Sequence, residues 1–286
     1  MENQVARKLI VTMYAESQLH AGKGMDVGIV DLPIQRERTT AFPIIQGVKG
    51  ALRANLKLDN EEEIFGSDNT KSQGDETKPG KVAFSEAKIL LFPVRHIEKL
   101  FVWVTSPLAL IRFLKELENK RELIKKLETL KIAEDEAIVL QEAGEILLED
   151  FQFKTKQDDV VKEIAEIITR NVATVDYIKK KLETDIVIVD DNRFSAICQM
   201  MTEVIPRIAI DKQTGTVKSG ALWYEEYLPQ DTVMYFVARE TIFSNKNPND
   251  QILETLQKAI DRAVITIGGK ETVGKGLVAL KVVNEQ

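Results

Sequence analysis

The chain has 286 residues, of which 44% are hydrophobic and 29% are charged, and it carries a net charge of −6. A chain of this length and composition can bury a substantial core, as one elaborated domain or as two small ones. Its single cysteine, Cys198, excludes an internal disulfide and a cysteine-based metal site, and no apolar run is long enough to cross a membrane. We therefore expect a cytoplasmic protein without a membrane partner.

The negative charge is unevenly spread along the chain. Residues 16–57 contain six Lys or Arg and four Asp or Glu, whereas the acidic excess lies in residues 58–76 and 133–150. A nucleic-acid partner normally requires a basic surface, because phosphates are anionic. A chain that is acidic on average can still carry a locally basic groove, so the composition does not exclude such a partner.

The predicted elements begin with a strand at residues 8–15, KLIVTMYA, where β-branched and aromatic residues mostly alternate. A glycine loop, the segment DLPIQRE (31–37) and a short extended FPII (42–45) then lead to a helix predicted over residues 48–58. Residues 59–82 are polar and rich in Gly, Asn and Ser, which predicts a long loop insertion.

The middle of the chain starts with a predicted hairpin of two strands, AKILLFPVR (87–95) and LFVWVTS (100–106). A Ser-Pro pair then begins a helix, predicted over SPLALIRFLKELENKRELIKKLETL (106–130), which has apolar residues at helical spacing. We expect residues 115–184 to form a predominantly helical, acidic insertion. A strand at 185–189 and an Asp-capped helix at 192–204 follow.

Residues 207–224 have a turn signal between two β-rich arms, which predicts a protruding hairpin. The remaining predicted elements are a strand at 232–239, a helix at 251–263 and strands at 264–267 and 277–283. Without the insertions, the order is strand, helix, strand, strand, helix, strand. This order predicts an α+β, ferredoxin-like core, the architecture that RNA-recognition folds also use.

Asp31 is the sharpest candidate for chemistry in the chain. In a loop beside Pro33, its carboxylate could bind a divalent cation or position a reacting hydroxyl, as carboxylates do in metal-assisted phosphodiester cleavage. It could equally be a turn-forming or capping residue. His20, next to the loop AGKG, could be an acid–base group or contact a phosphate, or it could simply pack in a turn.

Several cations and one glycine-rich loop could contact phosphates. Arg36 and Arg38 bracket Glu37, and Lys49 and Arg53 share one face of the predicted helix near its N-terminus, where the macrodipole favours an anion. The loop GGKETVGKG (268–276) could cradle a phosphate with its backbone N–H groups. It lacks the Walker pattern, so an ordinary hairpin turn is the alternative.

The strand LWYEEY (222–227) places Glu225 and Tyr227 on one face, because alternate residues of a strand point the same way. A carboxylate and a phenol at this spacing could flank a reacting phosphate or stack on a base. Cross-strand aromatic packing is the alternative.

In order along the chain, the motifs are HxGxG (20–24), DxPIQRE (31–37), KGALR (49–53), TSPL, TGTV followed by GALWYEEY, and GGKETVGKG. Their combination resembles the Cmr-type (type III-B) CRISPR backbone subunits of the RAMP superfamily over nearly the whole chain. The resemblance implies one elaborated RAMP domain over residues 1–286, with a modified ferredoxin-like (RRM-like) palm, a helical insertion and a β-hairpin thumb.

The resemblance also implies partners and an activity. Copies of such a subunit stack in a filament along the CRISPR guide RNA, together with other Cmr-type subunits. The subunit cuts complementary target RNA at regular intervals and uses a divalent metal ion, which we expect to be Mg²⁺. Two alternatives stay open, namely a structural RNA-binding backbone subunit without catalysis and a stand-alone ribonuclease that processes guide RNA.

Residue by residue, Asp31 matches the catalytic acid and metal ligand of the family, and His20, Glu225 and Tyr227 match positions near the cleavage site. The predicted RNA-binding residues are Lys49, Arg53, Arg36, Arg38, Gly268, Gly269, Lys270 and Lys275. One departure is visible, because GVKG before the helix is two residues shorter than the GxSLKG that the family usually has.

Overall fold

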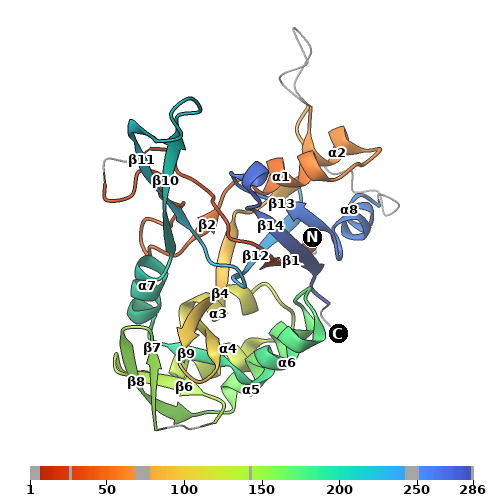
Figure 1. Ribbon diagram of the computed structural model, residues 1–286. Helices are drawn as coiled ribbons and strands as arrows, with labels where there is room; N and C mark the ends of the chain where they lie inside the picture. The colour runs from red at the N-terminus through yellow and green to blue at the C-terminus, as the bar shows by residue number, and fades with distance from the viewer. Residues whose placement is uncertain (1–6, 26–27, 68–77, 142–143, 242–250, 285–286) are drawn as a thin grey trace.

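The computed structural model describes residues 7–25, 28–67, 78–141, 144–241 and 251–284. At its centre, four antiparallel strands lie side by side in the order β14, β1, β12 and β4 (Figure 1). They comprise Leu277–Val282, Lys8–Ala15, Val233–Glu240 and Ala87–His96, respectively. The strand predicted at 8–15 is confirmed without a shift of either end.

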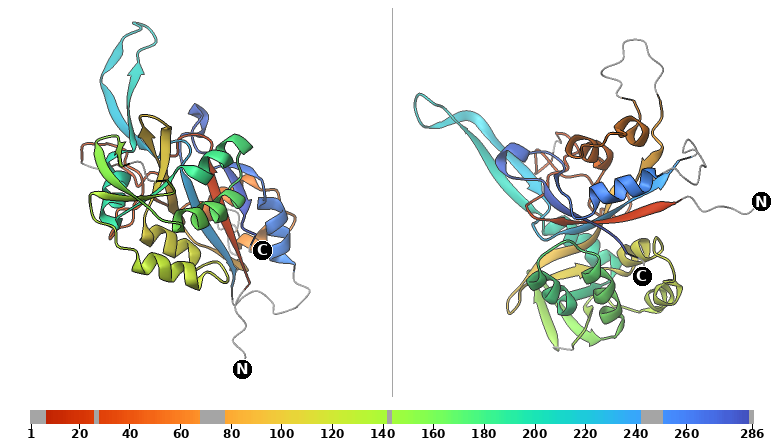
Figure 2. Two further views of the ribbon diagram at one scale, coloured as in Figure 1. Left: turned by 90° about the horizontal axis from the view of Figure 1, so that it is seen from below. Right: turned by 90° about the vertical axis from the view of Figure 1, so that its right-hand side faces the viewer.

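Helices α1 (Val48–Asn55) and α8 (Ile252–Ile260) cover one face of these four strands (Figure 2). Their apolar residues, such as Leu52 and Leu256, join the same core as Val11 of β1. The alternate residues of β1 belong to a second core on the opposite face, because successive side chains of a strand point to opposite sides. The sheet is therefore buried on both faces.

Smaller elements complete this half of the molecule. They are β2 (Ile44–Ile45), α2 (Glu61–Phe65), β3 (Val82–Phe84) and β13 (Val264–Thr266). Helix α2 lies inside the predicted loop insertion at 59–82, so that prediction was wrong for these five residues. Residues 68–77 of the same insertion lie outside the described part of the chain. Helix α1 ends three residues before the predicted end at 58.

Strand β4 also belongs to a closed ring of six strands. The ring runs β4, β5, β9, β6, β8 and β7, and it closes where His96 of β4 pairs with Leu148 of β7. The strands other than β4 comprise Leu100–Thr105, Ile186–Val189, Glu136–Val139, Phe151–Gln157 and Glu145–Leu148, in ring order. The predicted hairpin of β4 and β5 is confirmed.

The region predicted as a helical insertion at 115–184 contains strands as well as helices. Its helices are α4 (Arg121–Thr129), α5 (Val160–Arg170) and α6 (Asp176–Thr184). Strands β6, β7 and β8 were not predicted. Strands β6 and β7 have only four residues each, whereas β8 has seven residues, FQFKTKQ, whose exposed and buried side chains alternate as in a half-buried strand. The part of the chain that the structure describes has no helix long and apolar enough to span a membrane.

Helix α3 (Pro107–Leu114) starts as the Ser-Pro signal predicts. Ser106 is its N-cap, and its side chain accepts a hydrogen bond from the backbone of Ala109 at 3.4 Å. The sequence predicted one continuous helix from here to about residue 130, but the chain breaks between α3 and α4. Asn119 adopts a left-handed φ of 56° in this break, which cannot continue a right-handed helix.

A two-stranded hairpin, β10 (Glu203–Ile210) and β11 (Val217–Tyr227), projects from the body (Figures 1 and 2). It follows α7 (Asp191–Met200), whose N-cap Asp190 accepts hydrogen bonds from the backbone of Asn192 and Arg193. The predicted hairpin at 207–224 is thus present, and it is several residues longer at its base. That base is the part that meets the candidate site.

Candidate active site

The loop that carries Asp31 is paired with the foot of the hairpin. The backbone N–H of Leu32 donates to the carbonyl of Tyr224 at 3.1 Å, and the N–H of Glu226 donates to the carbonyl of Leu32 at 3.0 Å. Asp31 itself accepts a hydrogen bond on Oδ2 from the N–H of Tyr224 at 2.7 Å. Within the described residues its other oxygen, Oδ1, has no hydrogen-bond partner. Half-buried Asp31 is therefore held at one oxygen and free at the other.

His20 lies beneath this loop and is only 6% exposed. Its Nδ1 is 2.7 Å from the carbonyl oxygen of Glu226, and because a carbonyl only accepts, Nδ1 carries the proton. The ring centroid lies 5.4 Å from that of Tyr227. A Cβ atom at Gly22 would lie 2.8 Å from Nε2 of His20, so the glycine leaves room for the ring.

The loop GGKETVGKG packs against the backbone of His20. Gly269 donates its N–H to the carbonyl of His20 at 2.8 Å. Gly268 has a φ of +86°, and a Cβ there would lie 2.6 Å from the same oxygen. Both features require glycine at position 268. The N–H of Gly269 is used inside the protein, so this loop supports His20 as well as lining the surface.

Glu225 is almost fully buried, at 1% exposure, and its carboxylate is surrounded by donors. The hydrogen-bond donors are Lys270, Arg207 at 3.0 Å, Trp223 Nε1 at 2.8 Å and the hydroxyl of Tyr227. Burial alone would raise the pKa of this carboxyl, but these hydrogen bonds outweigh it and lower the pKa to about 2. Glu225 is therefore an ionised, fully partnered group.

Tyr227 is buried next to Glu225 and is a neutral phenol. Burial raises its pKa, and the hydrogen bond that it donates to Glu225 raises it further. The ammonium of Lys275 lies 5.4 Å from the centre of the Tyr227 ring and also donates to the side chain of Gln18. The ammonium groups of Lys270 and Lys275 thus lie around the foot of the hairpin.

The four remaining predicted RNA-binding cations differ in how far they are available. Lys49, in the first turn of α1, and Arg38 are exposed and have no hydrogen bond or ion pair within the described residues. Arg53 lies in the last turn of α1, not near its N-terminus as predicted, and its Nε donates to Glu61 at 2.7 Å. Lys49 and Arg38 are therefore the available cations of this set.

Arg36 is committed to contacts inside the protein. Its guanidinium forms an ion pair with Glu226 and donates to the carbonyls of Ala41, at 3.1 Å, and Cys198, at 2.8 Å. These contacts hold the segment after Asp31 against the C-terminal end of α7. This arrangement favours a structural role for Arg36 over a direct contact with RNA.

The acids of the site do not form a preformed metal cage. The residues that the structure describes contain no group of three or more His, Cys, Asp or Glu that could hold a metal ion. Glu225 and Glu226 are occupied by donors of the protein, which leaves Asp31 as the available carboxylate among these three described acids. This donor set fits a hydrated Mg²⁺ that takes its other ligands from water and substrate phosphates.

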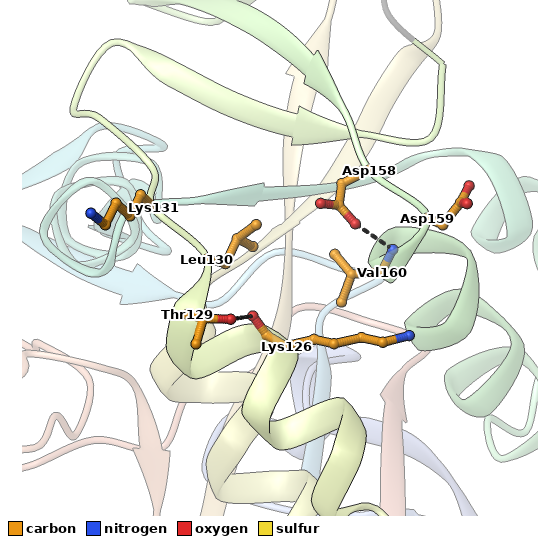
Figure 3. Close-up of a pocket in the computed structure, with 7 residues that line it drawn as sticks. All are labelled: Lys126, Thr129, Leu130, Lys131, Asp158, Asp159 and Val160. Atoms are coloured by element: carbon orange, nitrogen blue, oxygen red, sulfur yellow. Dashed lines mark hydrogen bonds between the residues drawn. The ribbon is translucent and has the colours of Figure 1, made fainter.

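A cavity of about 540 Å³ lies elsewhere, between α4 and the start of α5 (Figure 3). Its polar groups are largely paired inside the protein. Asp158 accepts a hydrogen bond from the N–H of Val160 at 2.8 Å, Thr129 donates to the carbonyl of Lys126, and Lys126 forms an ion pair with Glu163. No residue of the candidate site lines it.

Sequence reasoning missed Glu226 and Arg207 as parts of the site. Arg207 pairs in register with Trp223 across the hairpin, so the alternation of the two strands could have placed its side chain beside Glu225. The contact of Glu226 with the Asp31 loop joins segments almost 200 residues apart, and no local pattern reports it.

The chain belongs to the RAMP superfamily, whose family model matches residues 12–279. Among its relatives, the chain is 38% identical to the CRISPR system Cmr endoribonuclease Cmr4 of Pyrococcus furiosus, over 94% of this chain and 93% of that protein. It is 26% identical to the CRISPR system CMR subunit Cmr4 of Saccharolobus solfataricus, over 95% of each chain. The predicted resemblance to the Cmr-type backbone subunits is confirmed.

Solved structures agree with this assignment. The crystal structure of oligomeric Cmr4 from Pyrococcus furiosus superposes with a TM-score of 0.72 and 30% identity, covering 98% of this chain and 100% of that one. A cryo-EM structure of the Type III-B Cmr-beta complex bound to cognate target RNA contains a chain with the same fold, at a TM-score of 0.78 and 23% identity.

Proposed function

We propose that this chain is a backbone subunit of a Cmr-type CRISPR complex in the cytoplasm. It binds guide RNA, stacks with copies of itself and other Cmr-type subunits, and cleaves complementary target RNA at regular intervals. The observation that carries the catalytic part is the Asp31 carboxylate, which is fixed at the foot of the projecting hairpin with one oxygen left free. The similarity to a Cmr endoribonuclease supports the same activity.

We further propose that the four central strands are a ferredoxin-like, RRM-like palm within a single RAMP domain. Helix α1 lies between β1 and β4 in the chain, and α8 lies between β12 and β14, while the strands lie in the order β14, β1, β12, β4. This is the order of a split β-α-β motif. The six-stranded ring and its helices are then the insertion, and β10 and β11 form the thumb.

Guide RNA is held through phosphate contacts. Lys49 and Arg38 are exposed and unpaired within the described residues, so pairing with phosphate costs no internal ion pair. Such contacts fix the position of the strand but carry no base information. The subunit can therefore accept guides of any sequence, and base pairing of the guide selects the target.

The hairpin splays the guide–target duplex and exposes one target phosphate next to Asp31. The free Oδ1 of Asp31 orients the adjacent 2′-hydroxyl and takes its proton as the 2′-oxygen bonds to phosphorus. The bond from phosphorus to the 5′-oxygen breaks, and water protonates the leaving oxygen. When bound by Asp31, a divalent metal ion would supply positive charge for the phosphate. DNA lacks the 2′-hydroxyl and is not cut.

His20, Glu225 and Tyr227 act around this centre. All three are buried, so we assign them to shaping the foot of the hairpin and to fixing Lys270 and Lys275, whose ammonium groups face the same region. Ionised Glu225 partly offsets the charge of Lys270 and keeps the lysine in place. Among the predicted site residues, all of which the structure describes, Asp31 remains the carboxylate that is available to the substrate.

The decisive experiment uses the reconstituted complex, complementary RNA and Mg²⁺, with Asp31→Asn as the variant. Cleavage at regular intervals that disappears in the variant and without Mg²⁺, while the RNA remains bound, supports the proposal. Normal cleavage by a complex that carries Asp31→Asn would show that Asp31 is not the catalytic acid. This result would favour a structural subunit without catalysis. A particle that stays small with guide RNA, measured by light scattering, would favour a stand-alone processing ribonuclease.

A further inference from the structure

Glu226 is a buried acid in the hairpin foot, 6% exposed, and its polar atoms meet several separate segments of the chain. Its neighbours Glu225 and Tyr227 point to the opposite face of β11. Glu226 instead faces the loop of Asp31. A buried carboxylate needs donors around it, because an unpartnered charge in the interior is costly. The donors to the Glu226 carboxylate come from the Asp31 loop and from the segment that follows α7.

Two of the contacts hold the loop directly after Asp31. The backbone N–H of Glu226 donates to the carbonyl of Leu32 at 3.0 Å. Its carboxylate oxygen Oε2 accepts the N–H of Ile34 at 2.9 Å. The loop is therefore fixed at two residues, from the backbone and from the side chain of the same amino acid.

The other carboxylate oxygen connects the loop to the body. Oε1 accepts a hydrogen bond from the hydroxyl of Thr202 at 2.7 Å and pairs with the guanidinium of Arg36. Arg36 in turn donates to the carbonyl of Cys198 in α7. The Asp31 loop, α7 and β11 are thus joined through one carboxylate.

The carbonyl of Glu226 makes the last contact, because it accepts the Nδ1 proton of His20 at 2.7 Å. This hydrogen bond sets both the tautomer and the orientation of the imidazole. Residue 226 therefore holds the loop of Asp31 through its carboxylate and backbone N–H, and His20 through its backbone carbonyl.

We propose that Glu226 is a positioning residue for target-RNA cleavage, whose carboxylate acts through the loop of Asp31 without touching the RNA. The proposal rests on the proposed function, since it assigns the chemistry to Asp31. Both carboxylate oxygens must accept, one from Ile34 and the other from Thr202 and Arg36. An amide cannot replace the carboxylate, because its NH₂ group would face a donor on one side whichever way it is turned.

The test is Glu226→Gln in the reconstituted complex, with the target affinity and the single-turnover cleavage rate measured separately. We expect the cleavage rate to fall at least tenfold while the dissociation constant of target RNA changes less than twofold. Hydrogen exchange of peptides covering residues 28–36 should become faster, because the amide leaves either Ile34 or the pair Arg36 and Thr202 without an acceptor. Asp185→Asn is the matched control, since Asp185 is also buried and paired with two cations, Lys99 and Lys181, away from the site.

Unchanged cleavage by Glu226→Gln would overturn the proposal. So would a parallel loss of assembly, target affinity and rate, since this would indicate a general structural role. If Glu226→Gln does not fold, Thr202→Val removes one donor to Oε1 and should show the same separation of rate from affinity on a smaller scale. Asp31→Asn is measured alongside. If that variant cuts normally, the proposed function fails first; if only Glu226→Gln cuts normally, the positioning role fails alone.

Discussion

The backbone N–H of Tyr224 donates to the Asp31 carboxylate at 2.7 Å, across 193 positions of the sequence. This contact joins a loop near the N-terminus to the projecting hairpin formed by β10 and β11. The hairpin and the acid therefore occupy fixed positions relative to each other. The proposed function requires such a fixed arrangement, because the element that distorts RNA and the group that reacts with it have to be held together.

Asp31→Ala should separate binding from chemistry. The loss of one hydrogen bond at a half-exposed loop should cost about 1 kcal/mol of unfolding free energy. Target affinity should stay the same or rise slightly, because a negative charge near phosphates is removed. Cleavage should fall by orders of magnitude in a single-turnover assay. A rate near that of the wild type would show that Asp31 is only a structural acceptor for Tyr224.

Lys49→Ala should weaken guide-RNA binding without regard to sequence. One lost phosphate contact on a single strand should reduce the slope of log affinity against log salt by about 0.7. Filter binding at several salt concentrations measures this slope. Lys162→Ala is the control, because Lys162 is an exposed lysine on α5, on the opposite side of the sheet. An equal effect of both substitutions would indicate general electrostatics.

Shortening the hairpin between residues 211 and 218 should leave the core intact. The residues removed lie at the exposed tip, beyond the foot that contacts Asp31. Thermal unfolding should therefore change little, whereas regular target cleavage or assembly along the guide should be impaired. A shortened chain that assembles and cuts normally would refute the role of the hairpin in RNA distortion.

Glu225 should make the free energy of unfolding depend on pH in the acidic range. Its folded-state pKa of about 2 is lower than the usual carboxyl value, so its contribution is present above that usual value and is lost as the pH falls towards 2. The wild type should thus lose stability between about pH 5 and pH 2 more steeply than Glu225→Gln. Urea titrations at several pH values measure the difference. Parallel pH profiles would indicate that Glu225 is not held ionised.

Gly268→Ala should destabilise the chain more than Gly274→Ala. Both glycines have positive φ, at +86° and +76°, so both substitutions add backbone strain. Only at position 268 would the new Cβ meet an obstacle, 2.6 Å from the carbonyl oxygen of His20. Denaturant unfolding compares the two variants. If both variants lose the same free energy of unfolding, the loop can shift to accommodate the Cβ at position 268, and His20 does not depend on the close approach of Gly268.

The fold was predictable where local pattern is strong. The strand at 8–15, the hairpin of β4 and β5 and the projecting hairpin follow from alternation and turn residues. Strands β6 and β7 were missed, since strands of four residues owe their structure to partners in the ring more than to their own sequence. Local propensity is a weak guide to such tertiary pairing.

The site was predictable in part. Asp31, His20 and the residues of the hairpin foot could be named from their motifs, but which of them are buried could not. Arg36 looked like a surface cation beside Arg38, and the structure turns it inward to Glu226. The spacing of residues along the sequence does not reveal this ion pair, because Glu226 belongs to a strand that is remote in sequence.

The closed ring removes one of the two edges of the large sheet. Strand edges with unpaired N–H and C=O groups invite pairing with other chains, and proteins protect them. Here β4 is bonded on both sides, and β7 returns to it, so that end of the sheet has no open border. In the described part of the chain the other end is β13, a strand of three residues. The large sheet of a subunit that meets many copies of itself thereby offers few open strand edges for β-aggregation. The open edges described in this structure include those of the two-stranded hairpin, β10 and β11, where a neighbouring chain could pair.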